Sequence, residues 1–341
     1  MLRLIDANLN RASEGLRTLE DVARFILNDA RLSADLKSLR HDLTQEYAPP
    51  QKALLSARDS ARDVAAFVGQ ESEVHRTGVS DIVTASARRV EESLRVLEEF
   101  AKLPDSVLES DRFKRARFAL YDLERELTGR LLRQGRRVSG LYVIVDPEAL
   151  QGRDEVAVAE KAISGGARAV QLRDKRRSKI ETLRRANELR ALCARYDALF
   201  IVNDHLDVAL ASVADGLHLG HDDFPVSTTR QFLSIDTIVG RTTRTVESAL
   251  QAERDGADYV AVGSIYPTGS KTDTHVVGLK RLREVKEAVS IPVVAIGGIN
   301  ASNVADVVAA GADSVAVLSA VAGAEDVEGA ARRLSGAISS S

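Results

Sequence analysis

The sequence predicts an α/β protein in which a C-terminal (β/α)₈ barrel follows an all-helical N-terminal domain. In the first part of the chain, apolar residues recur at three- and four-residue spacing, as on the buried face of a helix. In the second part, short runs rich in valine and isoleucine alternate with helical stretches, as in parallel strands that are buried on both faces. With 341 residues, the chain is long enough for two domains of ordinary size.

Residues 1–134 are predicted to be helical throughout and contain an internal repeat, because residues 14–24 resemble residues 92–102. Among the identical positions, Leu16, Arg17, Leu19, Glu20 and Ala23 align with Leu94, Arg95, Leu97, Glu98 and Ala101. Two copies indicate a duplicated helical unit whose apolar faces pack together. We interpret the aligned Arg and Glu residues as ion pairs on a solvated face, with ligand binding as the alternative.

Residues 135–140 are predicted to form a linker, because the segment is polar, contains two glycines and breaks the helical period. Eight apolar runs follow, one for each expected strand: residues 141–146, 169–174, 199–204, 216–220, 237–242, 259–264, 292–298 and 314–319. Eight βα units in about 200 residues fit a compact barrel over residues 141–341. A doubly wound sheet is the competing fold, but no G-x-G-x-x-G segment follows the first strand.

Composition excludes several classes of partner. The formal net charge is −3, which provides no basic surface for nucleic acid or an acidic membrane. No stretch approaches the roughly 20 apolar residues of a membrane helix, and the N-terminal segment lacks the apolar core of a signal peptide. Cys193 is the single cysteine, as fits a reducing cytosol. We therefore expect a cytoplasmic protein with small-molecule partners, and homo-oligomer formation stays open.

Polar and charged residues gather where the predicted strands end. In a (β/α)₈ barrel these carboxyl ends meet at one rim, where such proteins carry their active sites. Arg173 and Lys175 follow the second strand, and Lys271 follows the sixth. Asp204 ends the third strand and Asp223 follows the fourth, and both offer the oxygen ligands that Mg²⁺ prefers. Cations beside a Mg²⁺ site indicate a diphosphate substrate.

Each of these assignments has a simpler alternative. Arg173 and Lys175 could form surface ion pairs with Asp174 and its neighbours, although the strand-end position disfavours this. Asp204 could cap the following helix. Asp222 is a second candidate metal ligand that spacing alone does not exclude.

A second phosphate site is predicted from the last two βα units. Gly298 follows the seventh strand, and Leu318 and Ser319 are expected at the start of the last helix, where backbone N–H groups form the usual phosphate cradle of a barrel. Ordinary turn glycines are the alternative. Two phosphate sites at one rim imply two phosphorylated substrates, or one substrate and a diphosphate leaving group.

Two other features are set aside. His218 and His221 resemble part of a zinc site, but such a site needs three or four convergent ligands. His218 alternates with leucines on the fourth strand, so it faces either the barrel centre or the helical layer. Cys193 has no neighbouring histidine in sequence that would activate it.

Several segments resemble the thiamine phosphate synthase family in their order and spacing: residues 171–175, 202–204, 214–220, 256–260, 263–268 with Lys271, and 295–299. The helical half resembles the extra domain of the long synthases of cyanobacteria and some other bacteria. The resemblance implies condensation of hydroxymethylpyrimidine diphosphate with a carboxylated thiazole phosphate, releasing diphosphate and CO₂. It also implies a dissociative order, in which diphosphate leaves before the thiazole nitrogen attacks the pyrimidine methyl cation.

The resemblance also implies roles for individual residues. The pyrimidine diphosphate would be held by Gln171, Arg173, Lys175, Asn203, Thr242 and Lys271. Mg²⁺ would be held by Asp204 and Asp223. The thiazole phosphate would be held by Thr268, Gly269, Ser270, Gly298, Leu318 and Ser319. Arg173, Lys175 and Lys271 would be catalytic, because they neutralise the leaving diphosphate.

Two alternatives to synthase activity differ in testable ways. A thiazole tautomerase on the same barrel uses a histidine just after the glycine of the sixth strand, where this chain has Ser264. A non-catalytic phosphate-binding barrel would bind the phosphorylated thiazole without turnover.

Overall fold

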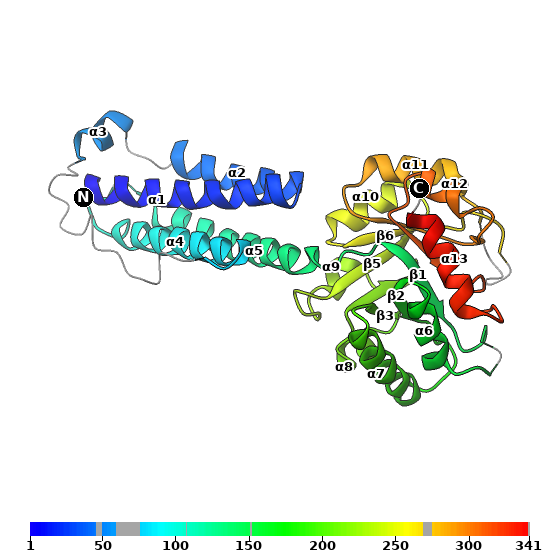
Figure 1. Ribbon diagram of the computed structural model, residues 1–341. Coiled ribbons are helices and arrows are strands. Elements are labelled where there is room, and N and C mark those ends of the chain that lie inside the picture. The colour runs from blue at the N-terminus through cyan, green and yellow to red at the C-terminus, as the bar shows by residue number, and fades with distance from the viewer. Residues whose placement is uncertain (46–49, 59–75, 107, 151, 269–274, 340–341) are drawn as a thin grey trace. The chain divides into compact units, whose positions relative to one another are not determined.

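The computed structural model describes residues 1–45, 50–58, 76–106, 108–150, 152–268 and 275–339. The chain divides into two compact units, Met1–Gln134 and Gly135–Ser341. Figure 1 shows both units. Among the described helices, none is both long and apolar enough to span a membrane.

The first unit is helical throughout its described part, as predicted. Its elements are α1 (Leu2–Asp21), which continues as the π-helical turn η1 (Val22–Ile26), α2 (Ala30–Gln45), α3 (Gln51–Ser56), α4 (Val79–Phe100) and α5 (Ser110–Gln134). The two repeat copies lie on α1 and α4, which pack against each other. Leu16 and Leu94, which are equivalent in the repeat, are both fully buried in one core.

The aligned glutamates of the repeat form ion pairs, but they do not lie on a solvated face. Glu20 is 3% exposed and its carboxylate lies 3.0 Å from Arg40 of α2. Glu98 is 4% exposed and its carboxylate lies 3.0 Å from Arg117 of α5. The predicted solvated face is therefore wrong for these carboxylates, because in each copy the following long helix brings an arginine over them.

Leu94→Ala is expected to lower the free energy of opening of this helical unit by about 2–5 kcal/mol, because it removes a fully buried side chain and leaves a cavity. Hydrogen exchange of α4 and α5 amides in the full-length protein measures this change locally. Leu132→Ala on α5 is the matched control, since Leu132 is 44% exposed. Equal protection in Leu94→Ala and the control would contradict the assigned core.

The second unit is a closed parallel barrel of eight strands in the order β1 to β8, as predicted. The strands are β1 (Gly140–Val145), β2 (Ala167–Leu172), β3 (Leu199–Asn203), β4 (Gly216–Leu219), β5 (Ile238–Thr243), β6 (Tyr259–Gly263), β7 (Val293–Ile296) and β8 (Ser314–Val317). Each bound lies within two residues of the predicted strand. Pairing of Leu141 in β1 with Val315 in β8 closes the barrel.

The helices of this unit surround the strands (Figure 1). They are α6 (Glu155–Ser164), α7 (Lys179–Arg195), α8 (Leu206–Ala211), α9 (Val226–Thr229), α10 (Val246–Arg254), α11 (Gly278–Ala288), α12 (Val304–Ala309) and α13 (Val327–Ser339). The apolar core between strands and helices is separate from a smaller cluster inside the barrel. Because most strand residues are buried on both faces, with Arg168 of β2 an exception, side chains reach solvent mainly at the ends of the barrel.

The predicted linker is part of the barrel unit. Val138 is 2% exposed and belongs to the cluster inside the barrel. Arg136 lies 3.4 Å from Asp215, and Arg137 lies 3.5 Å from Asp313. Since both aspartates immediately precede strands, these contacts tie the segment to the end of the barrel opposite the predicted site.

Candidate active site

A cavity of about 600 Å³ lies at the carboxyl ends of the strands. Every strand contributes to its lining: Ile144, Gln171, Asn203, His218, Thr242, Gly263, Ile296 and Val317. This volume falls in the range of small-molecule sites. The position agrees with the rule that barrel enzymes carry their chemistry at the carboxyl ends of the strands.

The structure brings together all of the predicted site residues that it describes. The residues that line the cavity are Gln171, Arg173, Lys175, Asn203, Asp204, Asp223, Thr242, Thr268, Gly298, Leu318 and Ser319. The remaining predicted residues, Gly269, Ser270 and Lys271, lie outside the described residues. The role of each residue stays a prediction.

Arg173 is held in the cavity wall by a partner on the neighbouring strand. Its guanidinium donates to Asp146, which directly follows β1 and is 4% exposed. Asp146 also accepts from the N–H of Glu148, 3.0 Å away, so the carboxylate is fixed by two donors. A planar guanidinium held on one side presents its other N–H groups in a defined direction.

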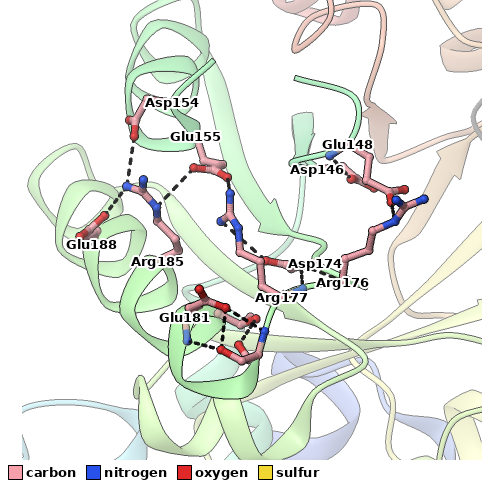
Figure 2. A network of polar contacts seen from close by, with 12 residues as sticks. Asp146, Glu148, Asp154, Glu155, Asp174, Arg176, Arg177, Glu181, Arg185 and Glu188 are labelled. Atoms are coloured by element: carbon pink, nitrogen blue, oxygen red, sulfur yellow. Dashed lines mark hydrogen bonds and ion pairs between the residues drawn. The ribbon is translucent and has the colours of Figure 1, made fainter. Parts of the chain in front are cut away.

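The rest of the loop after β2 is anchored by the polar contacts drawn in Figure 2, through residues that are not among those lining the cavity. Arg176 pairs with Glu148, and Arg177 pairs with the buried Glu155 of α6. The Asp174 carboxylate accepts from the backbone N–H groups of Arg176 and Arg177, at 3.2 and 3.1 Å. The alternative that Asp174 pairs with Arg173 or Lys175 is therefore not observed, since its described ion-pair partner is Arg177 at 3.7 Å.

Lys175 lines the cavity from the middle of this anchored loop. Its Nζ lies 3.9 Å from Asp204 Oδ2, at the limit of an ion pair, and its side chain is 54% exposed. Such a loosely held ammonium group can move toward an anion without breaking a buried contact.

Asp204 and Asp223 form a close carboxylate pair beside Lys175. Burial raises the pKa of Asp204 to about 6, the hydrogen bond to Asp223 and its charge add to this rise, and Lys175 opposes it. Asp223 is fixed by the backbone N–H of Gly220, which donates to Oδ2 at 2.6 Å. A buried carboxylate whose pKa is raised by a second carboxylate beside it provides a site for a cation.

The alternative role of Asp204 as a helix cap is wrong. The next helix, α8, begins at Leu206, and His205 is its N-cap residue without a side-chain capping bond. Asp204 instead adopts a left-handed backbone conformation, with φ of +61°, which aspartate tolerates better than most residues. Its carboxylate thereby remains at the cavity.

The glycines after β7 allow close approach of two backbone segments. At Gly298, with φ of +66°, a Cβ would lie 2.5 Å from the carbonyl oxygen of Pro267. At Gly297, with φ of +102°, a Cβ would lie 2.1 Å from Ser264 Oγ. These positions exclude side chains, so backbone groups form this part of the cavity wall.

Leu318 and Ser319 line the cavity, as predicted. The prediction that they begin the last helix is wrong. Helix α13 begins only at Val327. A turn separates the two, in which the N–H of Ala322 donates to the carbonyl of Leu318 at 2.8 Å. The physical reason is that Asp326 caps α13: its Oδ1 accepts from the backbone N–H of Gly329 at 2.9 Å, so the helix starts at Val327.

Gln171 carries a donor that has no partner in the described structure. The residue is 3% exposed, and its Nε2 atom is buried without a hydrogen bond among the described residues. A buried donor of this kind costs free energy unless an acceptor reaches it. Because Gln171 also lines the cavity, a bound ligand is the partner that would satisfy it.

Sequence reasoning missed several cavity residues, notably Arg244, His275 and Asn300. Arg244 follows β5 directly, so the rule applied to the other strand ends would have found it. His275 and Asn300 lie on connections whose distance from the strands the sequence pattern does not determine. Arg244 has no ion pair within the ranges that the structure describes, which leaves a further cation at this rim.

His218 faces the barrel centre, one of its two predicted orientations. Its ring nitrogens lie 2.9 Å from the hydroxyl oxygens of Tyr259 and Thr242. Within the described part of the chain, no group of three or more His, Cys, Asp or Glu residues is placed to hold a metal ion. Cys193 is buried in α7, and burial raises the pKa of its thiol to about 12.

Comparisons with known proteins agree for both units. Residues 141–321 match the family described as thiamine monophosphate synthase, and residues 3–126 match the ThiD2 family. A thiamine-phosphate synthase of Synechocystis sp. is 40% identical over 94% of this chain and 91% of its own length. One of Synechococcus sp. (strain CC9311) is 42% identical over 97% of this chain and 94% of its own. The solved thiamine phosphate pyrophosphorylase from Pyrococcus furiosus is 42% identical, with a TM-score of 0.56, over 62% of this chain and 98% of that one.

Proposed function

Because the chain belongs to the thiamine monophosphate synthase family, and acts as a transferase of that kind, we propose that the cavity at its barrel rim is where synthesis takes place. There, hydroxymethylpyrimidine diphosphate would be joined to a carboxylated thiazole phosphate, giving thiamine phosphate, diphosphate and CO₂. The observation that carries this proposal is the convergence of Arg173 and Lys175 with the carboxylate pair Asp204 and Asp223 on one cavity.

The carboxylate pair fits a magnesium ion that binds together with the diphosphate. Mg²⁺ is usually held by one or two carboxylates plus substrate phosphates, and the rise that Asp223 contributes to the pKa of Asp204 supports a cation between them. A bound Mg²⁺ would supply charge neutralisation to the diphosphate. Asp204 and Asp223 would hold the ion, and Asp222 also lines the cavity as the alternative ligand.

The two substrates would occupy different parts of the cavity. The pyrimidine diphosphate would lie against the β2, β3 and β5 ends, where Gln171 offers its unpartnered amide and Asn203 and Thr242 line the wall. The thiazole phosphate would lie against the β6, β7 and β8 ends, near Thr268 and Gly298. There the absence of a side chain at Gly298 lets backbone groups reach the phosphate.

The reaction order that fits these residues is dissociative. The cavity offers Arg173 and Lys175 to neutralise a leaving diphosphate, and it lacks a closely paired His and Glu for proton transfer among its described lining residues. Diphosphate would leave first, and the thiazole nitrogen would then attack the pyrimidine methyl cation. Holding both substrates in one cavity supplies the orientation that the second step needs.

The tautomerase alternative is not favoured, because the relatives are named as synthases and because Ser264 occupies the position of that enzyme's histidine. Ser264 lines the cavity and is 8% exposed. Serine lacks a group that titrates near neutral pH, so it does not replace a histidine in proton transfer.

The purified full-length protein is expected to form thiamine phosphate from both substrates with Mg²⁺, and a chelator should stop the reaction. A chain of residues 135–341 is expected to retain kcat within about three-fold, because every described lining residue belongs to the barrel. Product formation followed by chromatography measures both. Binding of thiazole phosphate without product would contradict synthase activity. Loss of activity in the shorter chain alone would assign the helical unit a part in turnover.

A further inference from the structure

A hydrogen-bonded chain of four side chains runs from the interior of the barrel to the cavity. The hydroxyl oxygens of Tyr142 and Tyr259 lie 3.1 Å apart. Tyr259 Oη lies 2.9 Å from His218 Nδ1, and His218 Nε2 lies 2.9 Å from Thr242 Oγ1. The two tyrosines are 2% and 1% exposed, whereas Thr242 lines the cavity. The chain therefore connects a fully buried hydroxyl to one that faces the substrates.

The packing around Tyr259 fixes this arrangement. A Cβ atom at Gly240 would lie 2.0 Å from Cζ of the Tyr259 ring, so only glycine leaves room for the ring. The Tyr259 ring stacks on His218, with ring centroids 5.6 Å apart and an interplanar angle of 22°. It meets the Tyr142 ring edge-on, with centroids 6.3 Å apart. The positions of the three rings are therefore fixed, and the available acceptors determine the direction of each O–H and N–H bond.

The donors and acceptors of this chain determine which ring nitrogen of His218 carries a proton. Burial raises the pKa of Tyr142 and of Tyr259, so both hydroxyls keep their protons. Within the described residues, Tyr259 is the one hydrogen-bond partner of the Tyr142 hydroxyl. If Tyr142 donates to Tyr259, then Tyr259 donates to His218 Nδ1, and the ring proton of His218 lies on Nε2.

Donation in the reverse direction, from His218 toward Tyr142, leaves one buried proton without an acceptor. If His218 carried a proton on Nδ1, it would donate to Tyr259, Tyr259 would donate to Tyr142, and the Tyr142 proton would have no acceptor. An unsatisfied buried donor disfavours this arrangement by about ten-fold or more in population.

We propose that His218 is a positioning residue for the synthase reaction, with a ring proton on Nε2, so that Thr242 accepts from His218 and is left to donate its own hydroxyl proton into the cavity. His218 Nε2–H donates to Thr242 Oγ1, and the Thr242 proton is then free for an acceptor atom of the substrate. The part played by Thr242 rests on the proposed function, whereas the proton arrangement in the free protein does not.

The arrangement selects the kind of atom that binds at Thr242. A hydroxyl that both accepts and donates by rotation would tolerate either an acceptor or a donor on the ligand. Here one of the two acceptor positions of Thr242 is already used by His218, so its O–H favours a substrate acceptor atom, such as a ring nitrogen or a phosphate oxygen. A ligand that presents an amino group at this point would bind less well.

Nitrogen-15 NMR of histidine-labelled full-length protein tests the proton arrangement, because the two ring nitrogens have different shifts in each tautomer. His218→Gln identifies the His218 signals among the six histidines. We expect a ring proton on Nε2 in the free protein. A ring that carries its proton on Nδ1 and not on Nε2 would overturn the proposal.

Removal of either tyrosine hydroxyl tests whether hydrogen bonding, and not the packing of the rings, sets the tautomer of His218. Tyr259→Phe removes the group that donates to Nδ1, so we expect a mixture of tautomers at His218. Tyr142→Phe is the matched control, because Tyr259 then ends the chain and still donates to Nδ1, so the Nε2–H tautomer should persist. If Tyr259→Phe fails to fold because Tyr142 loses its acceptor, the double Phe variant restores the balance. An unchanged tautomer without the Tyr259 hydroxyl would count against the proposal.

Kinetics test the contact at Thr242. Thr242→Val, which keeps the shape and removes the hydroxyl, should raise KM for the pyrimidine diphosphate about 3- to 10-fold and leave kcat within about three-fold. Thr242→Ser should restore KM, and KM for the thiazole phosphate should not change. An unchanged KM in Thr242→Val would overturn the contact. A complete lack of thiamine phosphate from the unmodified chain would refute the proposed function instead, and the histidine spectrum would still decide the proton arrangement.

Discussion

Lys175→Ala is expected to lower kcat about 100- to 1,000-fold while leaving the barrel folded. Loss of one preorganised group that stabilises developing charge has an effect of this size in other enzymes. Lys175 lines the cavity, its side chain is 54% exposed, and its nearest ion-pair partner is 3.9 Å away. Because no buried contact is lost, the thermal unfolding temperature should change by less than about 1 °C.

The effect should fall on kcat rather than on KM. The charge on the departing diphosphate oxygen grows as the bond to the pyrimidine methyl carbon breaks, so the ammonium group of Lys175 acts mainly in the transition state. Lys175→Arg keeps the charge and should recover part of the rate, with less precise placement. The measurement is the steady-state rate of product formation with both substrates saturating. It is made on the unmodified protein, Lys175→Ala and Lys175→Arg.

Lys179→Ala is the matched control for this loss of charge. Lys179 is similarly exposed, at 57%, and lies close by at the start of α7. It pairs with Asp207 at 3.0 Å and is not among the cavity residues. Its kcat should stay within about two-fold. If Lys175→Ala also stays within three-fold, the diphosphate assignment at the β2 end is wrong.

The barrel could be predicted from sequence because its signal is local. Each buried strand is a short run of β-branched residues, such as residues 259–263, and each run ends in polar residues that belong at the rim. Once the strands are placed, closure of the barrel brings Arg173, Asp204 and Asp223 together without further information.

Features that depend on packing between distant segments could not be predicted in this way. The burial of Glu20 and Glu98 depends on which helix covers them, and their spacing on α1 and α4 looks like an exposed face. The chain from Tyr142 to Thr242 joins β1, β6, β4 and β5, and alternation along one strand does not show which inner side chains meet. Leu318 was assigned to the wrong local structure because a turn and a helix start look alike in a short apolar run.

Removal of the proposed magnesium ligands should produce the second large effect. A shift in unfolding temperature measures this effect without any need for catalytic activity. Magnesium with inorganic diphosphate should raise the unfolding temperature of the barrel, because a ligand that binds only the folded state stabilises it by about 2.7 kcal/mol at 100 times its Kd. For a unit of this size, that corresponds to roughly 5–10 °C. Asp204→Asn and Asp223→Asn should each abolish most of this shift, and kcat should fall about 100-fold or more.

Without magnesium, the same substitution at Asp223 should not lower the unfolding temperature. Burial and Asp223 raise the pKa of Asp204 to about 6, so the two carboxylates destabilise each other when no cation lies between them. Asparagine at position 223 removes that repulsion, and its side-chain oxygen can still accept from the N–H of Gly220. The unfolding temperature without magnesium should therefore be unchanged or higher in Asp223→Asn, which separates loss of metal from loss of fold.

Asp222→Asn decides between the two candidate ligands of the β4 loop. Asp222 lines the cavity but is exposed, whereas Asp223 is held by Gly220 and interacts with Asp204. We expect Asp222→Asn to retain most of the magnesium-dependent shift in unfolding temperature, because an exposed, unanchored carboxylate contributes little to a site that needs fixed geometry. If Asp222→Asn loses the shift and Asp223→Asn keeps it, the ligand is Asp222. The Asp204–Asp223 pair would then be a strained contact with no metal to relieve it.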